Sequence, residues 1–534
     1  MRPCQGRPRG AYIAVSWLEG RAARQAHDGH LWIGRPDERT SPGCKRRRQA
    51  PERLCAQIVG LRVGEPKKGP IVTYATTNPY TGELIKSFPD ATDAEVGEAI
   101  DKAHATFLAW RDTPFTTRAA IMQKAAHLLR RDIEAYATIL TLEMGKVVPE
   151  AKDEVELTAR IFEYFAKNSE RLLAPRTLPV TDPAEGQAML VNEPLGVLLC
   201  IEPWNFPYYQ IVRLAAPQLS AGNTILLKHA SNVPQSAAAF AKLMREAGLP
   251  EGAFQNLYAT RSQIGMIIND PRVHGVALTG SEAAGADVAI QAARALKKST
   301  MELGGADAFV VLDDADLEKT VEWAVFGRHW NGGQVCCASK RMIVVDELYD
   351  RFLDGYAKGV SELRAGDPFD PGTTLAPLSS QAAAENLKDM IRKAVALGAK
   401  AQQVGPPVPN QGAFVQPTIL TEVSQDNPAR YWEFFGPVSM LFRAKDEVDA
   451  IRIANDSPFG LGGSVFTADA HHGLEVAKKI SSGMVFVNHP TKVEADLPFG
   501  GVRRSGYGRE LLGLGLTEFV NRKLIDVVDI DARF

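Results

Sequence analysis

The chain has 534 residues, which is too long for one hydrophobic core, so we expect two or three domains. With 45% hydrophobic and 23% charged residues, and no run near the roughly 20 apolar residues of a membrane helix, we expect a soluble, cytoplasmic protein. The six cysteines show neither a disulfide framework nor zinc spacing, and residues 71–534 carry 46 basic against 57 acidic side chains, which argues against nucleic acid as a partner.

Residues 1–70 form a basic leader, with 15 Lys and Arg against 6 Asp and Glu, and show no steady hydrophobic periodicity. The segment is disordered, a targeting peptide, or not native. "AYIAVSWL" (11–18) faintly resembles a signal sequence, but Glu19 and Arg21 follow at once. We expect ordered folding, and by hypothesis translation, to begin near Val72.

The next part of the chain alternates between helices and strands. Apolar residues three and four apart predict helices over 92–170. Short apolar runs then predict four strands separated by helical segments, which indicates a doubly wound parallel sheet with ligands at the carboxyl ends of its strands. These runs are "GVLLCIEP" (196–203), "TILLKHA" (224–230), "AFQNLYA" (253–259) and "VHGVALTGS" (273–281).

A second alternating region after about residue 305 predicts another α/β domain. It contains the runs "DAFVVLDD", "RMIVVDE", "SVFTAD" and "GMVFVNHP". The final stretch "TEFVNRKLIDVVDI" (517–530) is predicted to be extended, with no obvious partner strand in its own domain.

Two adjacent cysteines, Cys336 and Cys337, stand in "HWNGGQVCCASKR" behind Gly332 and Gly333. A free cysteine is often a small buried apolar residue, and that alternative stays open. The glycine pair, however, permits an unusual backbone path, and exposed backbone N–H groups beside the sulfur would favour a thiolate.

Three other motifs follow predicted strands. "PWNFP" (203–207) presents the amide of Asn205, either as an oxyanion donor or as a turn residue. "MELGG" (301–305) places Glu302 between apolar neighbours, either as a general base with a raised pKa or at a solvated strand end. "LTGSEAAG" (278–285) is a strand, a turn and a helix start, a geometry that suits a phosphate.

The thiol, the amide and the carboxylate form one chemical set. A thiolate attacks an aldehyde, the amide holds the oxyanion, a hydride leaves to an acceptor, and the carboxylate activates water to hydrolyse the thioester.

These motifs closely resemble the aldehyde dehydrogenase superfamily over residues 72–531. The match rests on "PWNFP", "LLK", "TGS", "MELGG", "GQVCC", "EFFGPV" and "LPFGGVRRSGYGRE", in the family's order. The resemblance implies homodimers or homotetramers and an α/β fold with three parts. These are a doubly wound nucleotide-binding domain (71–175 and 196–304), an α/β catalytic domain (305–485), and a β-ribbon oligomerisation element (176–195 and 503–534).

The resemblance also implies the roles of individual residues. Cys336 matches the nucleophile, Glu302 the general base and Asn205 the oxyanion donor, whereas Cys337 has no family-wide role and is expected to pack. No metal is implied. The implied cofactor contacts are Trp204, Lys228 at the adenosine ribose, Ser231, Gly280, Ser281 at the pyrophosphate, Leu303, Glu433 at the nicotinamide ribose, and Phe435.

Two groups of residues depart from common family patterns. Ser231 stands three positions after Lys228, where NAD-preferring relatives often carry Glu, so we expect NADP use with NAD tolerated. "YATRS" (258–262) replaces the usual glycines, and Arg261 within it is a candidate phosphate contact.

Two residues, Arg213 and Trp330, are the candidate substrate contacts. Arg213 matches one carboxylate-binding arginine of succinate-semialdehyde dehydrogenases, although it could be a surface helix residue. Trp330 replaces a second such arginine and could favour an apolar or aromatic aldehyde.

We therefore expect NAD(P)-dependent oxidation of a small-molecule aldehyde, with succinate semialdehyde first. The alternative is the same chemistry on aromatic or apolar aliphatic aldehydes. Acylation of coenzyme A is less favoured because Glu302 is present, and a catalytically silent ligand-binding or structural protein is a remote alternative.

Overall fold

The computed structural model describes residues 73–180 and 186–531. The expectations made for residues 1–70 lie outside the described residues. Within these ranges, no helix combines the length and the apolar character needed to cross a bilayer.

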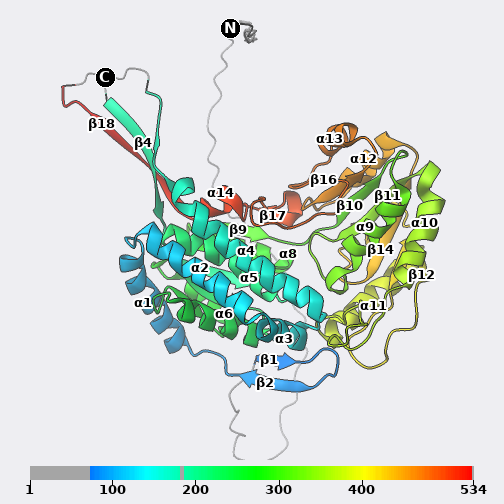
Figure 1. Ribbon diagram of the computed structural model, residues 1–534, viewed down its shortest axis with the longest axis horizontal. Helices are drawn as coiled ribbons and strands as arrows, with labels where there is room; N and C mark the ends of the chain where they lie inside the picture. Colours follow the sequence, from blue (N-terminus) through cyan, green and yellow to red (C-terminus); the bar gives the residue numbers. More distant parts are fainter. Residues whose placement is uncertain (1–72, 181–185, 532–534) are drawn as a thin grey trace, which may run out of the picture. The chain divides into compact units, whose positions relative to one another are not determined.

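A six-stranded sheet is the centre of the first α/β domain (Figure 1). Its order is β17-β9-β8-β5-β6-β7, and all neighbours are parallel except β17, which pairs antiparallel with β9. This confirms the predicted doubly wound sheet. The strands are β5 (Val197–Glu202), β6 (Thr224–His229), β7 (Phe254–Asn256), β8 (Val273–Thr279), β9 (Lys298–Glu302) and β17 (Gly506–Tyr507).

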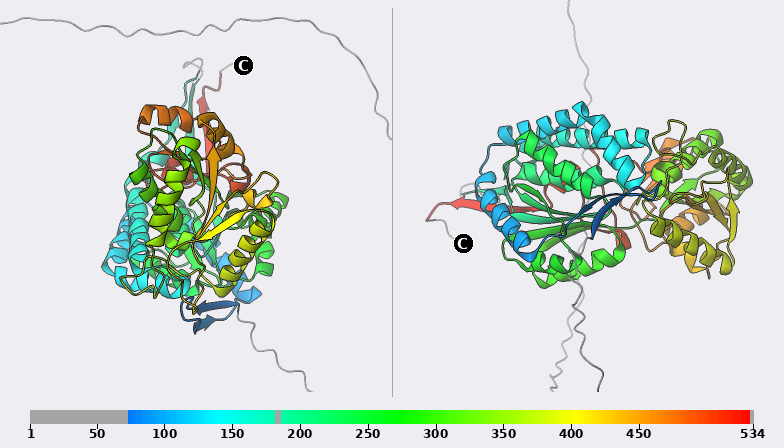
Figure 2. Two further views of the ribbon diagram at one scale, coloured as in Figure 1. Left: turned by 90° about the vertical axis from the view of Figure 1, so that its right-hand side faces the viewer. Right: turned by 90° about the horizontal axis from the view of Figure 1, so that it is seen from below.

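Helices cover both faces of this sheet, as the views in Figure 2 show. Leu198 and Cys200 of β5 pack among α2 to α6, whereas Val197 and Leu199 pack among α1, α7 and α8. A strand buried on both faces must be apolar at every position, which explains why these runs do not alternate in polarity. The helices are α1 (Asp93–Trp110), α2 (Phe115–Arg131), α3 (Ile133–Met144), α4 (Val148–Leu173), α5 (Pro207–Ala221), α6 (Pro234–Ala247), α7 (Arg261–Asn269) and α8 (Glu282–Arg294).

A seven-stranded sheet of order β12-β13-β14-β11-β10-β15-β16 forms the second α/β domain. The strands of the four predicted runs are present, whereas β12 to β14 were not predicted. The strands are β10 (Asp307–Val311), β11 (Ser339–Val345), β12 (Lys400–Gln403), β13 (Thr418–Thr421), β14 (Val438–Ala444), β15 (Gly463–Phe466) and β16 (Phe486–Val487). The helices are α9 (Leu317–His329), α10 (Asp346–Ser361), α11 (Gln381–Ala396), α12 (Glu447–Asn455) and α13 (Ala470–Ala477), with the short 3-10 turns η1 (Trp330–Gly333), η2 (Pro428–Tyr431) and η3 (Arg503–Ser505).

A three-stranded ribbon contains β3 (Arg176–Thr177), β4 (Gly186–Pro194) and β18 (Val520–Val528). The extended C-terminal segment therefore has a partner: β18 runs antiparallel to β4, with Leu524 opposite Leu190.

The structure divides the C-terminal region differently from the expected boundaries. Residues 506–507 form β17 at the edge of the first sheet, and α14 (Leu512–Leu516) contacts α4 and α5. Of the C-terminal strands, only β18 joins the ribbon, because the chain first pairs with β9 through β17. Likewise, β16 extends the second sheet past residue 485. Near the start, the turn residues around Asn78 connect a hairpin of β1 (Tyr74–Thr77) and β2 (Leu84–Phe88).

Candidate active site

Three neighbouring strands of the first sheet end in polar residues on one face. Glu202 ends β5, Thr279 ends β8 and Glu302 ends β9, with Thr279 directly beside Glu302 in register. The chain after β5 leads to Asn205, and the chain after β8 leads to Ser281. The predicted motifs therefore share the carboxyl edge of the sheet, where open α/β sheets bind ligands.

The loop that carries Cys336 follows α9 and has a constrained backbone. Asn331, Gly332 and Gly333 have φ values of 53°, 62° and 75°, in the left-handed region that favours glycine. A Cβ on Gly333 would lie 2.5 Å from the Gly436 carbonyl oxygen. The glycine pair is thus required both for the turn and for close packing against the loop before β14.

Cys336 is the thiol with the more acidic character. The hydrogen bond with the Cys337 side chain lowers the pKa of Cys336 below its usual value, with further help from the charges of Arg213 and Lys340, against the effect of burial. The same contact and burial raise the pKa of Cys337. Because the thiolate is the form that attacks, this difference agrees with the expectation that Cys336, rather than Cys337, is the nucleophile.

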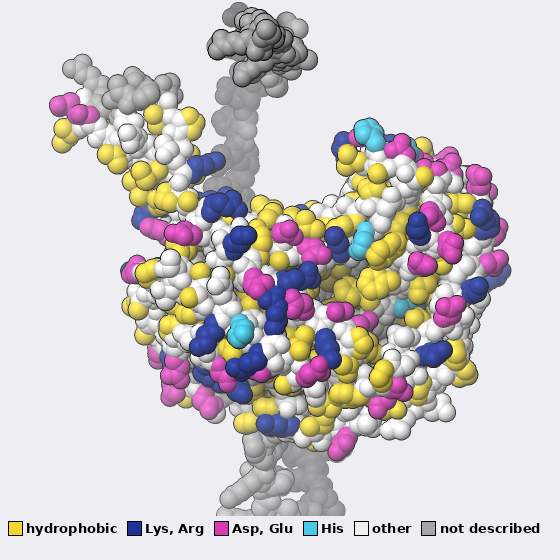
Figure 3. Space-filling view, in the orientation of Figure 1, with side chains coloured by type: hydrophobic (Ala, Val, Ile, Leu, Met, Phe, Trp, Pro, Cys, Tyr) yellow, Lys and Arg dark blue, Asp and Glu magenta, His cyan; other side chains and the backbone are white. Residues whose placement is uncertain are grey.

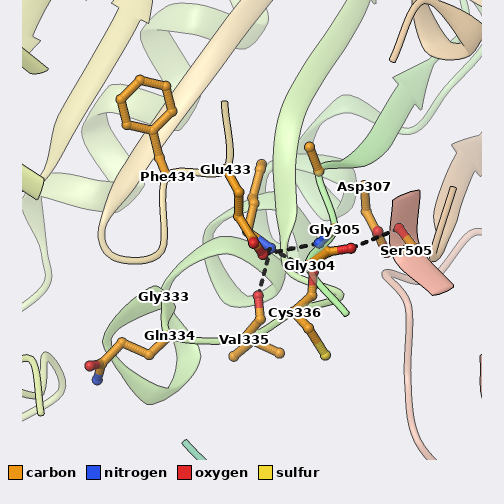
Figure 4. Close-up of polar contacts among 12 residues, drawn as sticks. Gly304, Gly305, Asp307, Gly333, Gln334, Val335, Cys336, Glu433, Phe434 and Ser505 are labelled. Atoms are coloured by element: carbon orange, nitrogen blue, oxygen red, sulfur yellow. Dashed lines mark hydrogen bonds and ion pairs between the residues drawn. The ribbon is translucent and has the colours of Figure 1, made fainter. Parts of the chain in front are cut away.

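Lys340 fixes the backbone on either side of the nucleophile. Its ammonium group is fully buried and donates to the carbonyl oxygens of Val335, at 2.7 Å, and Cys336, at 2.5 Å. It also forms an ion pair with Glu433 at 3.0 Å. Figure 4 shows Glu433 between this loop and the Gly304–Gly305 turn.

Asn205 is held against the cysteine loop. Its side-chain amide donates to the Gln334 carbonyl oxygen at 3.1 Å, and Gln210 donates to its side-chain oxygen at 3.3 Å. The Asn205 amide is thus held against the backbone two residues before Cys336. An oxyanion formed at the Cys336 thiol would require a donor of this kind.

Glu302 is buried, and neither of its carboxylate oxygens has a hydrogen-bond partner among the described residues. Burial raises its pKa well above the usual value, and Glu510 raises it further, whereas the Arg213 charge lowers it. A Cβ on Gly500 would lie 2.6 Å from Glu302 Oε1, so a glycine there leaves room for the carboxyl group. A carboxyl group whose pKa is raised in this way accepts a proton more readily than an ordinary carboxylate, as a general base requires.

Arg213 is fully buried, so its alternative as a surface helix residue is wrong. The guanidinium lies between the rings of Tyr209 and Phe499, 4.8 and 4.6 Å from their centroids. Its Nε is 2.5 Å from Glu510 Oε2, and its Nη2 donates to Thr279 at 3.1 Å. Arg213 therefore places a positive charge beside the end of β9.

Trp330 forms part of an aromatic wall. Its ring stacks on Phe326 with 5.9 Å between centroids and lies 5.2 Å from the ring of Phe206. These rings, with Trp323 and His489, line a cavity of about 360 Å³. The cavity adjoins the PWNFP segment and the cysteine loop, so an aldehyde that entered here would meet aromatic surface.

Several residues fit the adenosine and phosphate parts of a dinucleotide. The Lys228 ammonium group donates to the His229 carbonyl oxygen at 2.9 Å, and burial together with the nearby Arg261 charge lowers its pKa to about 8. Ser281 is the N-cap of α8, and the backbone N–H groups at a helix N-terminus can bind an anion such as a phosphate. Ser231 lies in the same region, and its carbonyl oxygen accepts from Ala75 N–H at 3.0 Å. The positive charges of Lys228 and Arg261, together with the N–H groups at the start of α8, suit a phosphorylated cofactor.

The other expected cofactor residues lie near the nucleophile loop. The rings of Trp204 and Phe435 meet edge to face, with 5.6 Å between centroids. Glu433 accepts from Gly305 N–H at 3.0 Å, so its carboxylate is engaged with the protein here. Leu303 packs where a Cβ of Gly285 would otherwise lie, and Gly280 N–H donates to the Glu302 carbonyl oxygen at 2.9 Å.

The sequence analysis missed five buried or half-buried charged residues of this region. Lys340 and Glu510 lie within quoted motifs but have no periodic signal of their own. The other three are spaced four residues apart, with one just before α4 and two on one face of α4, and only those two have a helical spacing that was a usable signal. They are Lys146, Glu150 and Glu154.

Comparisons with known proteins agree with this geometry. A family model described as "Aldehyde dehydrogenase family" matches residues 67–525. A succinate-semialdehyde dehydrogenase [NADP(+)] of Deinococcus radiodurans is 49% identical over 85% of this chain and 94% of its own length. Its counterpart in Mycobacterium avium is 44% identical over 84% of this chain and 96% of its own. A crystal structure of succinic semialdehyde dehydrogenase from Streptococcus pyogenes in complex with NADP+ has a TM-score of 0.83 and 44% identity, over 85% of this chain and 100% of its own.

Proposed function

The chain belongs to the aldehyde dehydrogenase family, and from this premise we propose that it oxidises succinate semialdehyde to succinate with NADP. The observation that carries the proposal is the meeting of Cys336, Asn205 and Glu302 at one edge of the first sheet. Relatives at 44–49% identity that bear the name succinate-semialdehyde dehydrogenase support the choice of aldehyde.

The side chains act in two stages. The Cys336 thiolate adds to the aldehyde carbon, and the Asn205 amide, with the Cys336 backbone N–H, donates to the resulting oxyanion. NADP, when bound, would supply the hydride acceptor. Glu302 then takes a proton from the water that attacks the thioester, and the Cys336 thiolate leaves.

NADP is the favoured cofactor because positive charge surrounds the position expected for the adenosine ribose. Lys228 and Arg261 lie close enough for their charges to interact. Ser231, in place of an acid, leaves room for a 2′-phosphate and does not repel it.

Arg213 is the residue we propose for the substrate carboxylate, because it is a buried cation whose charge reaches both Cys336 and Glu302. The aromatic wall around Trp330 favours a second candidate function, the oxidation of aromatic or apolar aliphatic aldehydes. The cysteine chemistry is the same in both cases.

We also propose that the chain forms homodimers or homotetramers through the ribbon. Apolar side chains gather on it in Figure 3, and Leu524, Ile525, Val527 and Val528 of β18 are exposed. Exposed apolar patches of this kind mark interaction surfaces.

Formation of reduced cofactor at 340 nm tests the proposed reaction. Succinate semialdehyde, benzaldehyde and hexanal are each offered with NADP and with NAD. A preference for succinate semialdehyde with NADP is expected. A preference for the uncharged aldehydes would establish the second candidate, and no reduction with any pair would overturn both.

A further inference from the structure

One turn of α4 contacts both halves of the candidate active site, namely the segment that contains Asn205 and the loop that contains Cys336. Glu154 is buried, and its Oε1 accepts from the backbone N–H groups of Tyr208 at 2.9 Å and Tyr209 at 3.2 Å. These N–H groups belong to the first turn of α5, directly after the segment that contains Asn205. A carboxylate there satisfies free donors and complements the helix dipole.

Glu150, four residues earlier on the same face, holds the other half. Both of its carboxylate oxygens accept from the Asn331 N–H, each at 3.0 Å. Asn331 is the buried left-handed residue at the start of the cysteine loop. The carboxylate thus stabilises a backbone turn that a non-glycine residue adopts only at a cost.

The Asn331 side chain joins the two halves. Its amide donates to the Asn205 carbonyl oxygen at 2.9 Å and to the Gln334 carbonyl oxygen at 3.3 Å. Asn205 itself donates to the same Gln334 oxygen. A displacement of the Asn331 turn would therefore change the spacing between Asn205 and Cys336.

Lys146 stabilises the two carboxylates from the turn before α4. Its fully buried ammonium group pairs with Glu154 and lies 3.6 Å from the centroid of the Phe206 ring. Its charge also lowers the pKa of Glu150.

Burial nevertheless raises the pKa of Glu150 to about 7, with Asp153 adding to the rise and the Asn331 N–H opposing it. Other charged or titratable groups line the same cavity, namely Glu154, Arg160, His489, Lys492 and Glu494. Of these groups, the cations Arg160 and Lys492 both form ion pairs with Glu494, at 3.1 and 3.9 Å.

We propose that Glu150 is a positioning residue for the nucleophile: its carboxylate fixes the Asn331 turn, and through it the spacing between Cys336 and Asn205. The proposal rests on the proposed function in one respect, because kcat and KM can be measured only with an aldehyde that the protein oxidises. Glu150 touches no reacting atom in this arrangement, so it acts through the loop.

The variant Glu150→Gln keeps the shape of the side chain and one acceptor oxygen but cannot ionise. It resembles the protonated wild-type residue. The ratio of variant to wild-type activity should therefore depend on pH, and titrations common to both proteins, such as that of Cys336, cancel in this ratio.

The test measures kcat and KM for the aldehyde from pH 6 to 8.5, and separately the rate of Cys336 alkylation by iodoacetamide, followed by mass spectrometry. At pH 8.5 we expect Glu150→Gln to lower kcat and the alkylation rate by about threefold to tenfold, with little change in KM, because a loop that shifts by a fraction of an ångström loses reactive geometry. At pH 6 both ratios should approach one.

Glu156→Gln is the matched control. It removes the same charge from α4 but only breaks a surface ion pair with Arg130, at 2.8 Å, so it should leave every rate unchanged. A variant-to-wild-type ratio that stays constant with pH, or stays near one throughout, would overturn the proposal. The alkylation measurement needs neither aldehyde nor cofactor, so failure of the proposed substrate leaves this test intact.

Discussion

Arg213 and Glu510 form a buried ion pair beside Glu302, with 2.5 Å between Arg213 Nε and Glu510 Oε2. Glu202, Glu302 and Glu510 all surround this one guanidinium, and each has a raised pKa because of burial and its acidic neighbours. Arg213 thus faces three buried carboxyl groups, with Arg509 also near Glu302, and their raised pKa values favour protonation of part of the cluster.

Arg213→Met should weaken binding of a carboxylate substrate selectively. We expect KM for succinate semialdehyde to rise about tenfold, which corresponds to a lost charge-assisted hydrogen bond of about 1.5 kcal/mol. KM for hexanal should stay within about twofold, because that aldehyde has no carboxylate. Steady-state assays with both aldehydes check this.

The single variant also leaves Glu510 buried without its cation, at a cost of about 3–5 kcal/mol of stability. The double variant Arg213→Met with Glu510→Gln removes both charges and is the matched control. An equal rise of KM for both aldehydes in the double variant would show that Arg213 does not recognise the carboxylate.

Cys337→Ala should make Cys336 less reactive at neutral pH without abolishing turnover. The Cys337 side chain lowers the pKa of Cys336, so its loss raises that pKa and reduces the thiolate fraction at pH 7. We expect slower alkylation of Cys336 at pH 7 and equal rates above the shifted pKa.

Cys336→Ser, in contrast, should abolish dehydrogenation while NADP still binds. Full activity in that variant would contradict the assignment of Cys336 as the nucleophile.

Asn205 and Glu302 could be predicted because each stands at or just after the end of a strand in a short motif, and the carboxyl ends of parallel strands meet at one edge. Cys336 lies in the loop after α9, so only its own glycine-rich motif points to it.

Nothing in the sequence shows how Asn331 holds the cysteine loop, because its partners Glu150 and Asn205 are far away in the chain. Glu150 and Asn331, for example, are separated by 181 positions. Lys340 contacts carbonyl groups close to it in the chain, but no pattern in the sequence marks its ammonium group as buried. The strands β12 to β14 escaped prediction because their runs are short or interrupted by proline and polar residues.

The assignment of Arg213 to a buried ion pair also lay beyond the sequence. Helix α5 is buried along its whole length between α4 and the sheet, so no polar face marks a solvent side. The amphipathic pattern that normally separates surface from core is therefore absent from it.

Glu202→Gln should stabilise the protein at alkaline pH. Burial and the Glu510 charge raise the pKa of Glu202 to about 8, whereas an unfolded Glu ionises near its ordinary value of about 4.3. Between these values the folded state binds more protons than the unfolded state, so wild-type stability falls as pH rises through this window.

Gln at position 202 removes this dependence and still offers an oxygen to the Cys200 thiol, which lies 3.1 Å from Glu202 Oε1. The gain should be small at pH 5 and at least about 1 kcal/mol at pH 8, since one pKa unit corresponds to about 1.4 kcal/mol. Urea unfolding at both pH values measures it. Equal stabilities of the two proteins at pH 8 would contradict the raised pKa.

Ser231→Glu should shift cofactor preference from NADP toward NAD. A carboxylate at this position would repel a 2′-phosphate and compete with it for Lys228. Two like charges placed side by side cost several kcal/mol of binding free energy. We expect the NADP dissociation constant to rise about tenfold to a hundredfold, and that of NAD to change by no more than about threefold. Ser231→Ala is the control, because it loses only a hydroxyl group. The fold should tolerate both variants, since the contact with Ala75 uses the backbone carbonyl of Ser231. An unchanged NADP affinity in Ser231→Glu, measured by fluorescence titration, would place the 2′-phosphate elsewhere.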